Sequence, residues 1–321
     1  MLNTSSLASR LRGIIVPMVT PLAAADELDL TGLERLVDRL LAGGVHGLFV
    51  LGSCGEGPSL SPRVQRDLVD RVCRQTAQRV PVLVGVIDAS TTASMDQARH
   101  AAEAGADAVV LAPPFYFPLE QEEVYAYFTS QAAESPLPVI LYNMPGLTKI
   151  VIEPETVRRL LDNPRIIGLK DSSGDLPYFR AAREATRGRA DWTLLVGQER
   201  LVAEATALGG DGGVTGGANV LPQLFVRLYE AARAGLAEIS AGCQSDVERL
   251  AGVYSAASPN GVTASGVIKG LKASLAALNV CSALPCPPLS RLSAEQSERV
   301  RTILHTMGAS SMPSPAAAQQ Q

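Results

Sequence analysis

The sequence predicts an α/β fold, a (β/α)8 TIM barrel with a C-terminal helical extension, and three observations lead to it. Short apolar runs rich in β-branched residues recur between residues 14 and 217. Each run is followed by a turn and then by a longer stretch with helical periodicity. After residue 234 the apolar runs stop, and only helical stretches follow.

The expected strands are continuously apolar instead of alternating between apolar and polar residues. This pattern is typical of parallel strands that are covered on both faces. Eight strand–helix units joined by short loops are typical of a closed (β/α)8 barrel. The runs lie at 14–20, 47–52, 81–87, 107–113, 138–143, 165–170, 193–198 and 212–217.

The intervals between the runs carry helix signals. Residues 61–78 place apolar side chains at a spacing of four, with Ser61 as the expected N-cap and Pro62 at the first helical position. Residues 91–106 follow the same period and end at Gly105, a residue type that commonly follows a helix C-terminus. The barrel is therefore expected to have an outer layer of helices.

A doubly wound parallel sheet is the structural alternative, because it also alternates strands with helices. Its dinucleotide-binding versions open the first crossover helix with the pattern GxGxxG. No such pattern follows the run at 14–20, so we prefer the barrel.

The chain divides into four expected parts. Residues 1–12 are expected to form a flexible N-terminus, and residues 13–234 the barrel. Residues 235–307 are expected to form the helical extension. The low-complexity stretch at 308–321 is predicted to be a disordered tail.

Composition excludes several kinds of partner. A formal net charge of −4 provides no basic field for nucleic acid, and no apolar stretch is long enough to suggest a membrane span. The five cysteines form no CxxC pair, which favours reduced thiols and a cytoplasmic location. The three histidines are isolated from one another, so we expect no metal site and a small-molecule substrate.

A lysine and a tyrosine end two consecutive strands of the predicted barrel. Active sites of such barrels lie at the C-terminal ends of the strands. Lys170 closes the run "RIIGLK", although the chain has only four lysines, and Tyr142 closes the run before it. Burial above an apolar interior disfavours the charged ammonium, and a free amine condenses with a ketone to form a Schiff base. A neighbouring phenol can carry protons in such a reaction.

The segment "GSCGEGPSLS" (52–61) is the second chemical signal. It carries glycines and hydroxyls between a strand end and a helix start, so its backbone amides and the Ser53 hydroxyl can hold a carboxylate. Glu199, after the strand at 193–198, can hydrogen-bond sugar hydroxyls, or it can simply begin a helix.

These stretches resemble the family of dihydrodipicolinate synthase and N-acetylneuraminate lyase, which are class I pyruvate-dependent barrels. The resemblance runs from about residue 13 to residue 305. The motifs that carry it, in order, are "PMVTP", "GSCGEGPSLS", "APPFYFP", "LYNMP", "GLKDSSGD" and "GGDGGVTGGANV".

The resemblance implies roles for four catalytic residues and no cofactor. Lys170 is similar to the lysine that forms the covalent imine, and Tyr142 to the tyrosine that relays protons. Ser53 is similar to the residue that links this tyrosine to a second one, Tyr116, which family members often supply from a neighbouring subunit. A homo-oligomer, dimer or tetramer, is expected on this ground.

The resemblance also implies a set of substrate-binding positions and two departures from the family pattern. The thiol of Cys54 stands where a Thr or Ser is usual, and Leu147 stands where the synthase presents an arginine to its second substrate's carboxylate. With the candidate Glu199 included, the predicted binding positions are Cys54, Gly55, Gly197, Val214, Leu147 and Glu199.

We therefore predict a class I aldolase that cleaves a 2-keto-3-deoxy (sugar) acid to pyruvate and an aldehyde, or runs the reverse addition. Parts of the sequence read most like 2-keto-3-deoxy-gluconate aldolases and, in two stretches, like 4-hydroxy-2-oxoglutarate aldolases. The alternatives are 4-hydroxy-tetrahydrodipicolinate synthase, N-acetylneuraminate lyase and, outside this class, a non-catalytic barrel that binds 2-keto acids. A metal-dependent hydrolase is disfavoured by the strand-end residues.

Overall fold

The protein is described here from a computed structural model that places residues 4–258 and 260–309. From residue 310 onward, the predicted disordered tail lies outside the described residues.

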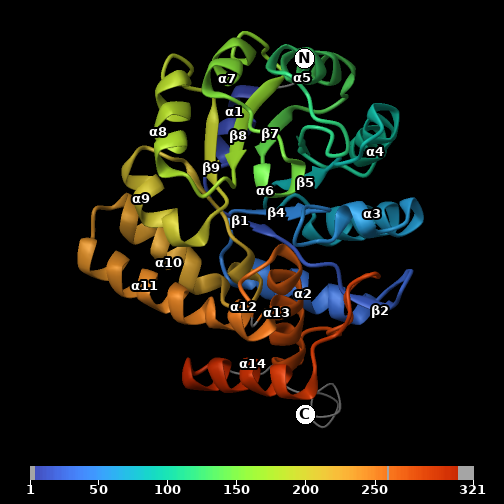
Figure 1. Ribbon diagram of the computed structural model, residues 1–321, viewed down its shortest axis with the longest axis vertical. Coiled ribbons are helices and arrows are strands. Elements are labelled where there is room, and N and C mark those ends of the chain that lie inside the picture. The colour runs from blue at the N-terminus through green and yellow to red at the C-terminus, as the bar shows by residue number, and fades with distance from the viewer. Residues whose placement is uncertain (1–3, 259, 310–321) are drawn as a thin grey trace.

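Eight parallel strands close into a barrel in the order β1-β10-β9-β8-β7-β6-β5-β4, so the predicted fold class is confirmed (Figure 1). Every residue in these strands is buried, which explains why the apolar runs do not alternate. A separate two-stranded hairpin, β2 (Leu22–Ala24) with β3 (Glu27–Leu28), follows β1. The barrel strands are β1 Gly13–Pro17, β4 Gly47–Val50, β5 Val82–Gly85, β6 Ala108–Leu111, β7 Val139–Asn143, β8 Ile166–Asp171, β9 Thr193–Val196 and β10 Gly212–Val214.

Helices cover the outside of the barrel, and their ends follow from local sequence. The Ser61 hydroxyl accepts from the Val64 amide at the start of α3, as expected of an N-cap. Gly105 has a φ of +88° just after α4, a left-handed conformation that glycine adopts without steric cost. The outer helices are α2 Leu30–Ala42, α3 Pro62–Thr76, α4 Thr91–Glu103, α5 Gln121–Glu134, α7 Pro154–Leu160, α8 Leu176–Ala185, α9 Val202–Ala207 and α10 Pro222–Arg233.

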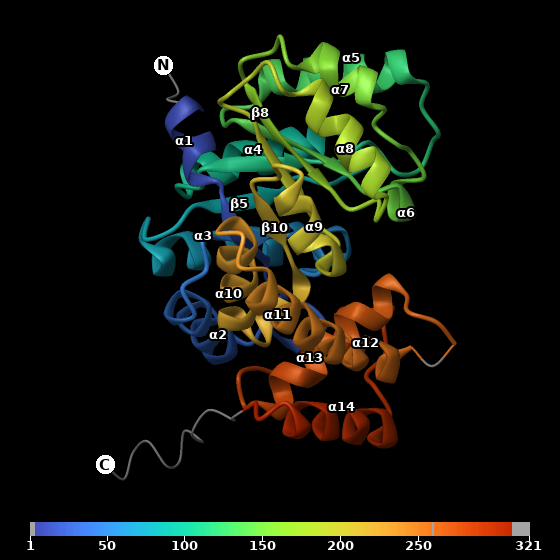
Figure 2. The same cartoon turned by 90° about the vertical axis from the view of Figure 1, so that its left-hand side faces the viewer.

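Four further helices follow α10 and lie together on one side of the barrel, in the lower half of Figures 1 and 2. They are α11 Ala237–Leu250, α12 Gly252–Ala257, α13 Ala264–Ala277 and α14 Ala294–Thr306. Short helical turns also occur at strand ends: η1 Gly57–Ser59, α6 Pro145–Thr148, η2 Glu199–Leu201 and η3 Gly216–Asn219.

Part of residues 1–12, the segment predicted to be a flexible N-terminus, is helical and packed against the barrel in the structure. Thr4–Arg10 forms helix α1, whose Leu7 is buried, as is Leu11 directly after it. Both leucines belong to the apolar cluster inside the barrel, and the Thr193 hydroxyl donates to the Ala8 carbonyl at 3.0 Å. The prediction was based on the serines and arginines of this segment and did not consider its two leucines. These leucines cover the barrel end opposite Lys170.

Truncating Leu11 is expected to lower the free energy of unfolding by about 2–5 kcal/mol, because Leu11→Ala leaves a cavity in a closed apolar cluster. Denaturant unfolding followed by circular dichroism measures the change. Leu236, which is 50% exposed, is the control, and Leu236→Ala should leave the unfolding midpoint nearly unchanged. Equal midpoints for both variants would show that Leu11 does not help to close this end of the barrel.

Candidate active site

Strands β7 and β8 bring Tyr142 and Lys170 side by side. The two residues are direct partners in the parallel register of these strands. Both lie at the C-terminal ends of their strands, and both are buried. The sequence prediction that they are neighbours is confirmed.

The Lys170 ammonium lies among aromatic rings. Its Nζ is 3.8 Å from the centroid of the Tyr142 ring and 4.8 Å from that of Phe49, and the residue is only 5% exposed. Among the described residues it forms no ion pair. Lys170 is therefore a buried amine without a carboxylate partner, which leaves it available to react with a carbonyl carbon.

A hydroxyl from a different strand end reaches Tyr142. The Ser53 Oγ and the Tyr142 Oη share a hydrogen bond of 3.2 Å. Ser53 lies in the loop after β4 (Gly47–Val50), so this bond connects the carboxylate-binding candidate loop to the lysine–tyrosine pair. Three of the four predicted catalytic residues therefore meet at one place.

The loop after β4 holds an unusual backbone conformation. Leu51 and Glu56 have φ angles of 59° and 57°, in the left-handed region that non-glycine residues rarely adopt. The Glu56 amide donates to the Ser53 carbonyl, and the Gly57 amide to the Gly52 carbonyl. Strained residues of this kind cluster at ligand-binding sites.

Two backbone amides of this loop have no acceptor. Within the part of the chain that the structure describes, the amides of Cys54 and Gly55 donate to no protein group. The Gly55 carbonyl accepts from the buried Thr20 hydroxyl at 2.6 Å, which fixes the peptide that follows β1 against the loop. Two free amides in a fixed turn are suited to a carboxylate or another anion.

The thiol of Cys54 is not a nucleophile in this setting. Burial raises the pKa of Cys54 to about 11, and the Lys170 ammonium opposes this rise only in part. The carboxylates of Glu199 and Glu56 act in the same direction as burial. The thiol is therefore protonated at neutral pH, where it serves as a weak hydrogen-bond donor.

The residue after Lys170 organises the neighbouring loop. The buried Asp171 carboxylate accepts from the Asn143 side-chain amide at 2.8 Å and from the Ser173 amide and hydroxyl at 3.0 Å. Burial raises the pKa of Asp171, and these hydrogen bonds work against the rise. Because side chains alternate along a strand, Asp171 points away from the barrel interior and supports the site from outside.

Glu199 is buried at the end of β9, but its carboxylate is already bound by protein groups. Its Oε1 accepts from the Gly217 amide at 2.6 Å, and the Tyr254 hydroxyl lies 3.2 Å from both carboxylate oxygens. That Glu199 binds substrate stays a prediction, and these contacts favour a structural role for its side chain. The alternative interpretation of the sequence, that Glu199 begins a helix, agrees with the structure, because the helical turn η2 starts at this residue.

Glu199→Gln is expected to gain stability relative to the wild type as pH rises. Burial raises the pKa of Glu199 above its ordinary value of 4.5, so the native state binds this proton more readily than the unfolded chain. That contribution is complete below pH 4.5 and is lost as pH rises through the raised pKa, whereas glutamine has no charge to bury.

Urea unfolding of the wild type and Glu199→Gln between pH 4.5 and pH 8 measures this difference. The exposed Glu238 on α11 provides the control, and the effect of Glu238→Gln should stay constant with pH. A constant effect for Glu199→Gln as well would contradict the prediction.

The remaining predicted residues lie at three different places. Val214 is buried in the apolar cluster inside the barrel with Tyr142. Gly197 packs so closely on Ser172 that an added Cβ would lie 1.9 Å from the serine hydroxyl oxygen, so a larger residue would require the Ser172 side chain to move. Leu147, in α6, is 42% exposed.

Tyr116 does not join the other catalytic residues within one chain. It is 77% exposed on the loop after β6, and its ring packs edge-on against Phe117 at 5.0 Å. The only hydrogen bond recorded for the Ser53 and Tyr142 hydroxyls among the described residues is the one they share.

Sequence reasoning missed two contributors. Phe49 lies on β4 with its ring near the Lys170 ammonium, and nothing in its run of apolar residues distinguishes it. Lys272 is fully buried on α13 and pairs with Glu56. The scarcity of lysine that drew attention to Lys170 applied to Lys272 as well, and could have found it.

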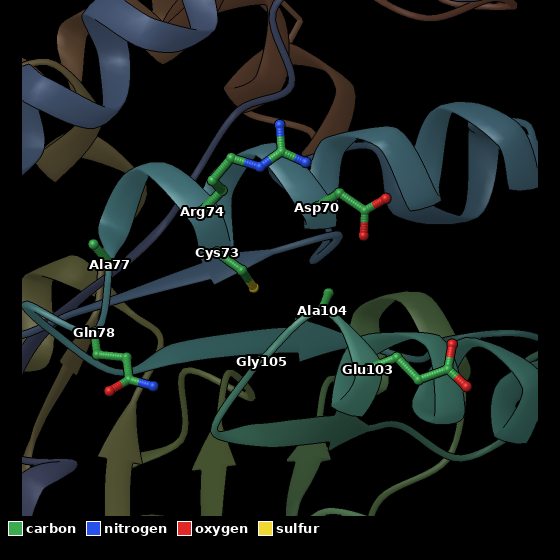
Figure 3. A pocket seen from close by; sticks show the side chains of 8 residues that line it. All are labelled: Asp70, Cys73, Arg74, Ala77, Gln78, Glu103, Ala104 and Gly105. Carbon is green, nitrogen blue, oxygen red and sulfur yellow. The ribbon is translucent and has the colours of Figure 1, made fainter.

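A surface pocket lies at the other end of the barrel, between the C-terminal turns of α3 and α4 (Figure 3). Asp70, Arg74 and Glu103 carry its charges, and burial raises the pKa of the Cys73 thiol to about 12. None of its lining residues belongs to the strand-end site.

Two kinds of feature are missing from residues 4–258 and 260–309. No group of three or more His, Cys, Asp or Glu side chains is placed to hold a metal ion. None of the helices there combines the length and the apolar character needed to cross a membrane.

An unpaired amine beside a phenol at the strand ends of an α/β barrel is an arrangement suited to a lyase or aldolase. The chain belongs to the dihydrodipicolinate synthetase family, whose sequence model matches residues 10–307. It is accordingly an enzyme of the pyruvate-dependent lyase and aldolase class. The family resemblance of the sequence is confirmed.

Similar proteins include both synthases and aldolases. A 4-hydroxy-tetrahydrodipicolinate synthase from Methanopyrus kandleri is 32% identical over 306 residues, which cover 93% of this chain and 97% of the relative. The solved dihydrodipicolinate synthase from Bacteroides thetaiotaomicron is 40% identical with a TM-score of 0.88, covering 92% of this chain and 98% of that one.

The third relative is YagE from Escherichia coli K12, a putative 2-dehydro-3-deoxy-D-gluconate aldolase. It is 31% identical over 299 residues, which cover 92% of this chain and 96% of YagE. Its structure in complex with pyruvate has a TM-score of 0.87 and 29% identity and covers 93% of this chain and 99% of that one.

Proposed function

We propose that the chain is a cofactor-free class I aldolase for 2-keto-3-deoxy sugar acids, with a covalent imine on Lys170. The observation that carries the proposal is the Lys170 amine, which is buried against the Tyr142 ring without an ion-pair partner. The reaction also needs a group that transfers protons, and the hydrogen bond with Ser53 holds the Tyr142 hydroxyl in place for this role.

The proposed reaction begins when the Lys170 amine attacks the C2 ketone of the substrate. Water leaves, and the resulting imine withdraws the electron pair of the C3–C4 bond. Tyr142 takes the proton of the C4 hydroxyl, the aldehyde departs, and an enamine remains on Lys170. Return of a proton to C3 and hydrolysis of the imine release pyruvate and restore the free amine.

The substrate carboxylate is proposed to lie on the loop after β4. The free amides of Cys54 and Gly55 are donors there, and Ser53 precedes them. A backbone site suits this chain because the Cys54 thiol donates more weakly than the hydroxyl usual at its position.

The aldehyde half is proposed to be a polyhydroxylated fragment without a carboxylate of its own. Leu147 lies in α6, directly after β7, and supplies no positive charge there. The nearby Lys149 ammonium donates to the Gly146 carbonyl at 2.9 Å. This contact works against the rival synthase activity, which would need a cation in place of the missing arginine.

Leu147→Arg is expected to raise kcat/KM for an aldehyde that carries a carboxylate by about 10- to 100-fold. An arginine fork forms a charge-assisted pair worth roughly 1.5–3 kcal/mol with a carboxylate. Initial rates of pyruvate addition to succinic semialdehyde and to glyceraldehyde measure the change, with Leu147→Gln as the uncharged control. An equal gain for both aldehydes would contradict the charge argument.

The active enzyme is proposed to be a cytoplasmic homo-oligomer, a dimer or tetramer. The exposed aromatic residues Phe115, Tyr116 and Phe117 form an apolar segment beside the barrel mouth, and Tyr116 would complete the site of a second copy. All five cysteines are free, which supports a reducing compartment.

Borohydride trapping with pyruvate tests the proposal. The wild-type protein should gain the mass of one reduced pyruvyl group, and peptide mapping should assign it to Lys170. The other three lysines, Lys149, Lys269 and Lys272, are internal controls for non-specific reduction. A folded protein with no adduct, or with the adduct on another lysine, would refute the imine mechanism, and release of pyruvate from 2-keto-3-deoxygluconate tests the substrate class.

A further inference from the structure

A buried ion pair connects the C-terminal extension to the loop after β4. The Lys272 ammonium on α13 pairs with the Glu56 carboxylate, and their side chains are 0% and 1% exposed. The Lys272 Nζ also donates to the Leu284 carbonyl at 2.8 Å, and the Cys286 amide donates to Glu56 Oε2 at 2.6 Å. Glu56 is therefore held by residues more than 200 positions later in the chain.

Stability alone does not explain this pair. Removing two charges from water costs several kcal/mol, and apolar residues of similar volume often replace buried ion pairs without loss of stability. What such a pair does provide is a defined position, because each charge is satisfied only when the partner is in place. In this protein the pair fixes the position of Glu56. This residue has a left-handed φ and ends the turn that contains the amides of Cys54 and Gly55.

A second contact joins the extension to the surroundings of the same loop. The Tyr254 hydroxyl on α12 lies 3.2 Å from both oxygens of the Glu199 carboxylate, which also accepts from the Gly217 amide. An added Cβ at Gly216 would touch the Cys54 Sγ at 3.4 Å, so this segment packs directly on the loop. Besides burial, both anchored carboxylates, Glu56 and Glu199, act electrostatically on the Cys54 thiol and raise its pKa.

We propose that the C-terminal helices act as a positioning element for the carboxylate-binding loop, with Lys272 and Tyr254 as positioning residues. Neither touches the reacting atoms: Lys272 acts through Glu56, and Tyr254 through Glu199. The inference rests on the proposed function, since the loop is assigned there to the substrate carboxylate. It predicts that loss of either contact weakens carboxylate binding more than it slows the chemical step.

The test uses the full-length double variant Glu56→Gln/Lys272→Met. The glutamine keeps an acceptor for the Cys286 amide, and the methionine keeps the length of the lysine, so both charges leave together. The pyruvate concentration that gives half-maximal borohydride trapping should rise about tenfold or more, while the maximal extent of trapping at saturating pyruvate stays near that of the wild type. Hydrogen–deuterium exchange of peptides covering residues 52–60 should accelerate without pyruvate.

Lys269→Met is the matched control, because Lys269 lies on the same helix, is partly buried, and its side chain forms no hydrogen bond or ion pair with the other described residues. Its half-maximal pyruvate concentration should equal that of the wild type. A folded double variant with half-maximal trapping within twofold of the wild type and unchanged exchange at residues 52–60 would overturn the proposal.

Two further measurements distinguish a double variant that does not fold from a failure of the proposed function. If the double variant does not fold, Tyr254→Phe decides: a rise of about threefold in half-maximal pyruvate supports the positioning role, and an unchanged value overturns it. If the wild type itself traps no pyruvate, the proposed function fails, and exchange at residues 52–60 still measures whether the extension holds the loop.

Discussion

Lys170→Met is expected to lower kcat/KM for cleavage of a 2-keto-3-deoxy acid on the order of 10⁴-fold or more, because removal of a covalent nucleophile eliminates the pathway it opens. Methionine has a similar length and no charge, and it suits the space between the rings of Tyr142 and Phe49. The variant should therefore fold with an unfolding midpoint near that of the wild type.

Coupled detection of released pyruvate measures the rate, and borohydride trapping should give no adduct. Lys269→Met, which also removes one lysine, should keep wild-type activity and trapping. Activity in Lys170→Met above about one hundredth of the wild-type value would show that another group performs the reaction.

Tyr142→Phe is expected to have the second largest effect, a loss of about 10²- to 10⁴-fold in kcat, the range for a proton-transferring group. The ring and its packing against Phe49, with centroids 6.4 Å apart, remain in the variant, and only the hydroxyl is lost. Imine formation with pyruvate should slow, while the Lys170 adduct still accumulates after long incubation.

Ser53→Ala removes only the hydrogen-bond partner of the Tyr142 hydroxyl. The loss in kcat should be smaller, about tenfold, because Tyr142 keeps its proton but loses its orientation. Tyr125→Phe provides the control, since that tyrosine lies on α5 with its ring over Arg159. If Tyr142→Phe were as active as Tyr125→Phe, the phenol could not be the proton carrier.

The barrel followed from local features of the sequence. A strand buried on both faces needs apolar residues at every position, so eight continuous runs were visible without any knowledge of contacts. Ser61 and Gly105 marked helix ends for local reasons, a side-chain cap and a left-handed φ. Strand order in a closed barrel then placed Tyr142 next to Lys170.

Features that depend on distant contacts were predicted less well. Residues 4–11 have the composition of a flexible segment, and only the end of the barrel opposite Lys170 gives Leu7 and Leu11 a place to be buried. That Glu199 binds substrate hydroxyls stays a prediction, and its contacts with the Gly217 amide and the Tyr254 hydroxyl could not be predicted from the sequence. Tyr116 has the residue type of a catalytic group but lies exposed within a single chain.

The sequence by itself determined the fold class, the family and the lysine and tyrosine at neighbouring strand ends, because periodicity and strand order are properties of the chain. Only the tertiary structure decided what surrounds them: the free amides of Cys54 and Gly55, and the buried pair of Glu56 with Lys272. The physical reason is that the partner of a buried charge is chosen by packing between segments far apart in the chain, and no local pattern records that choice.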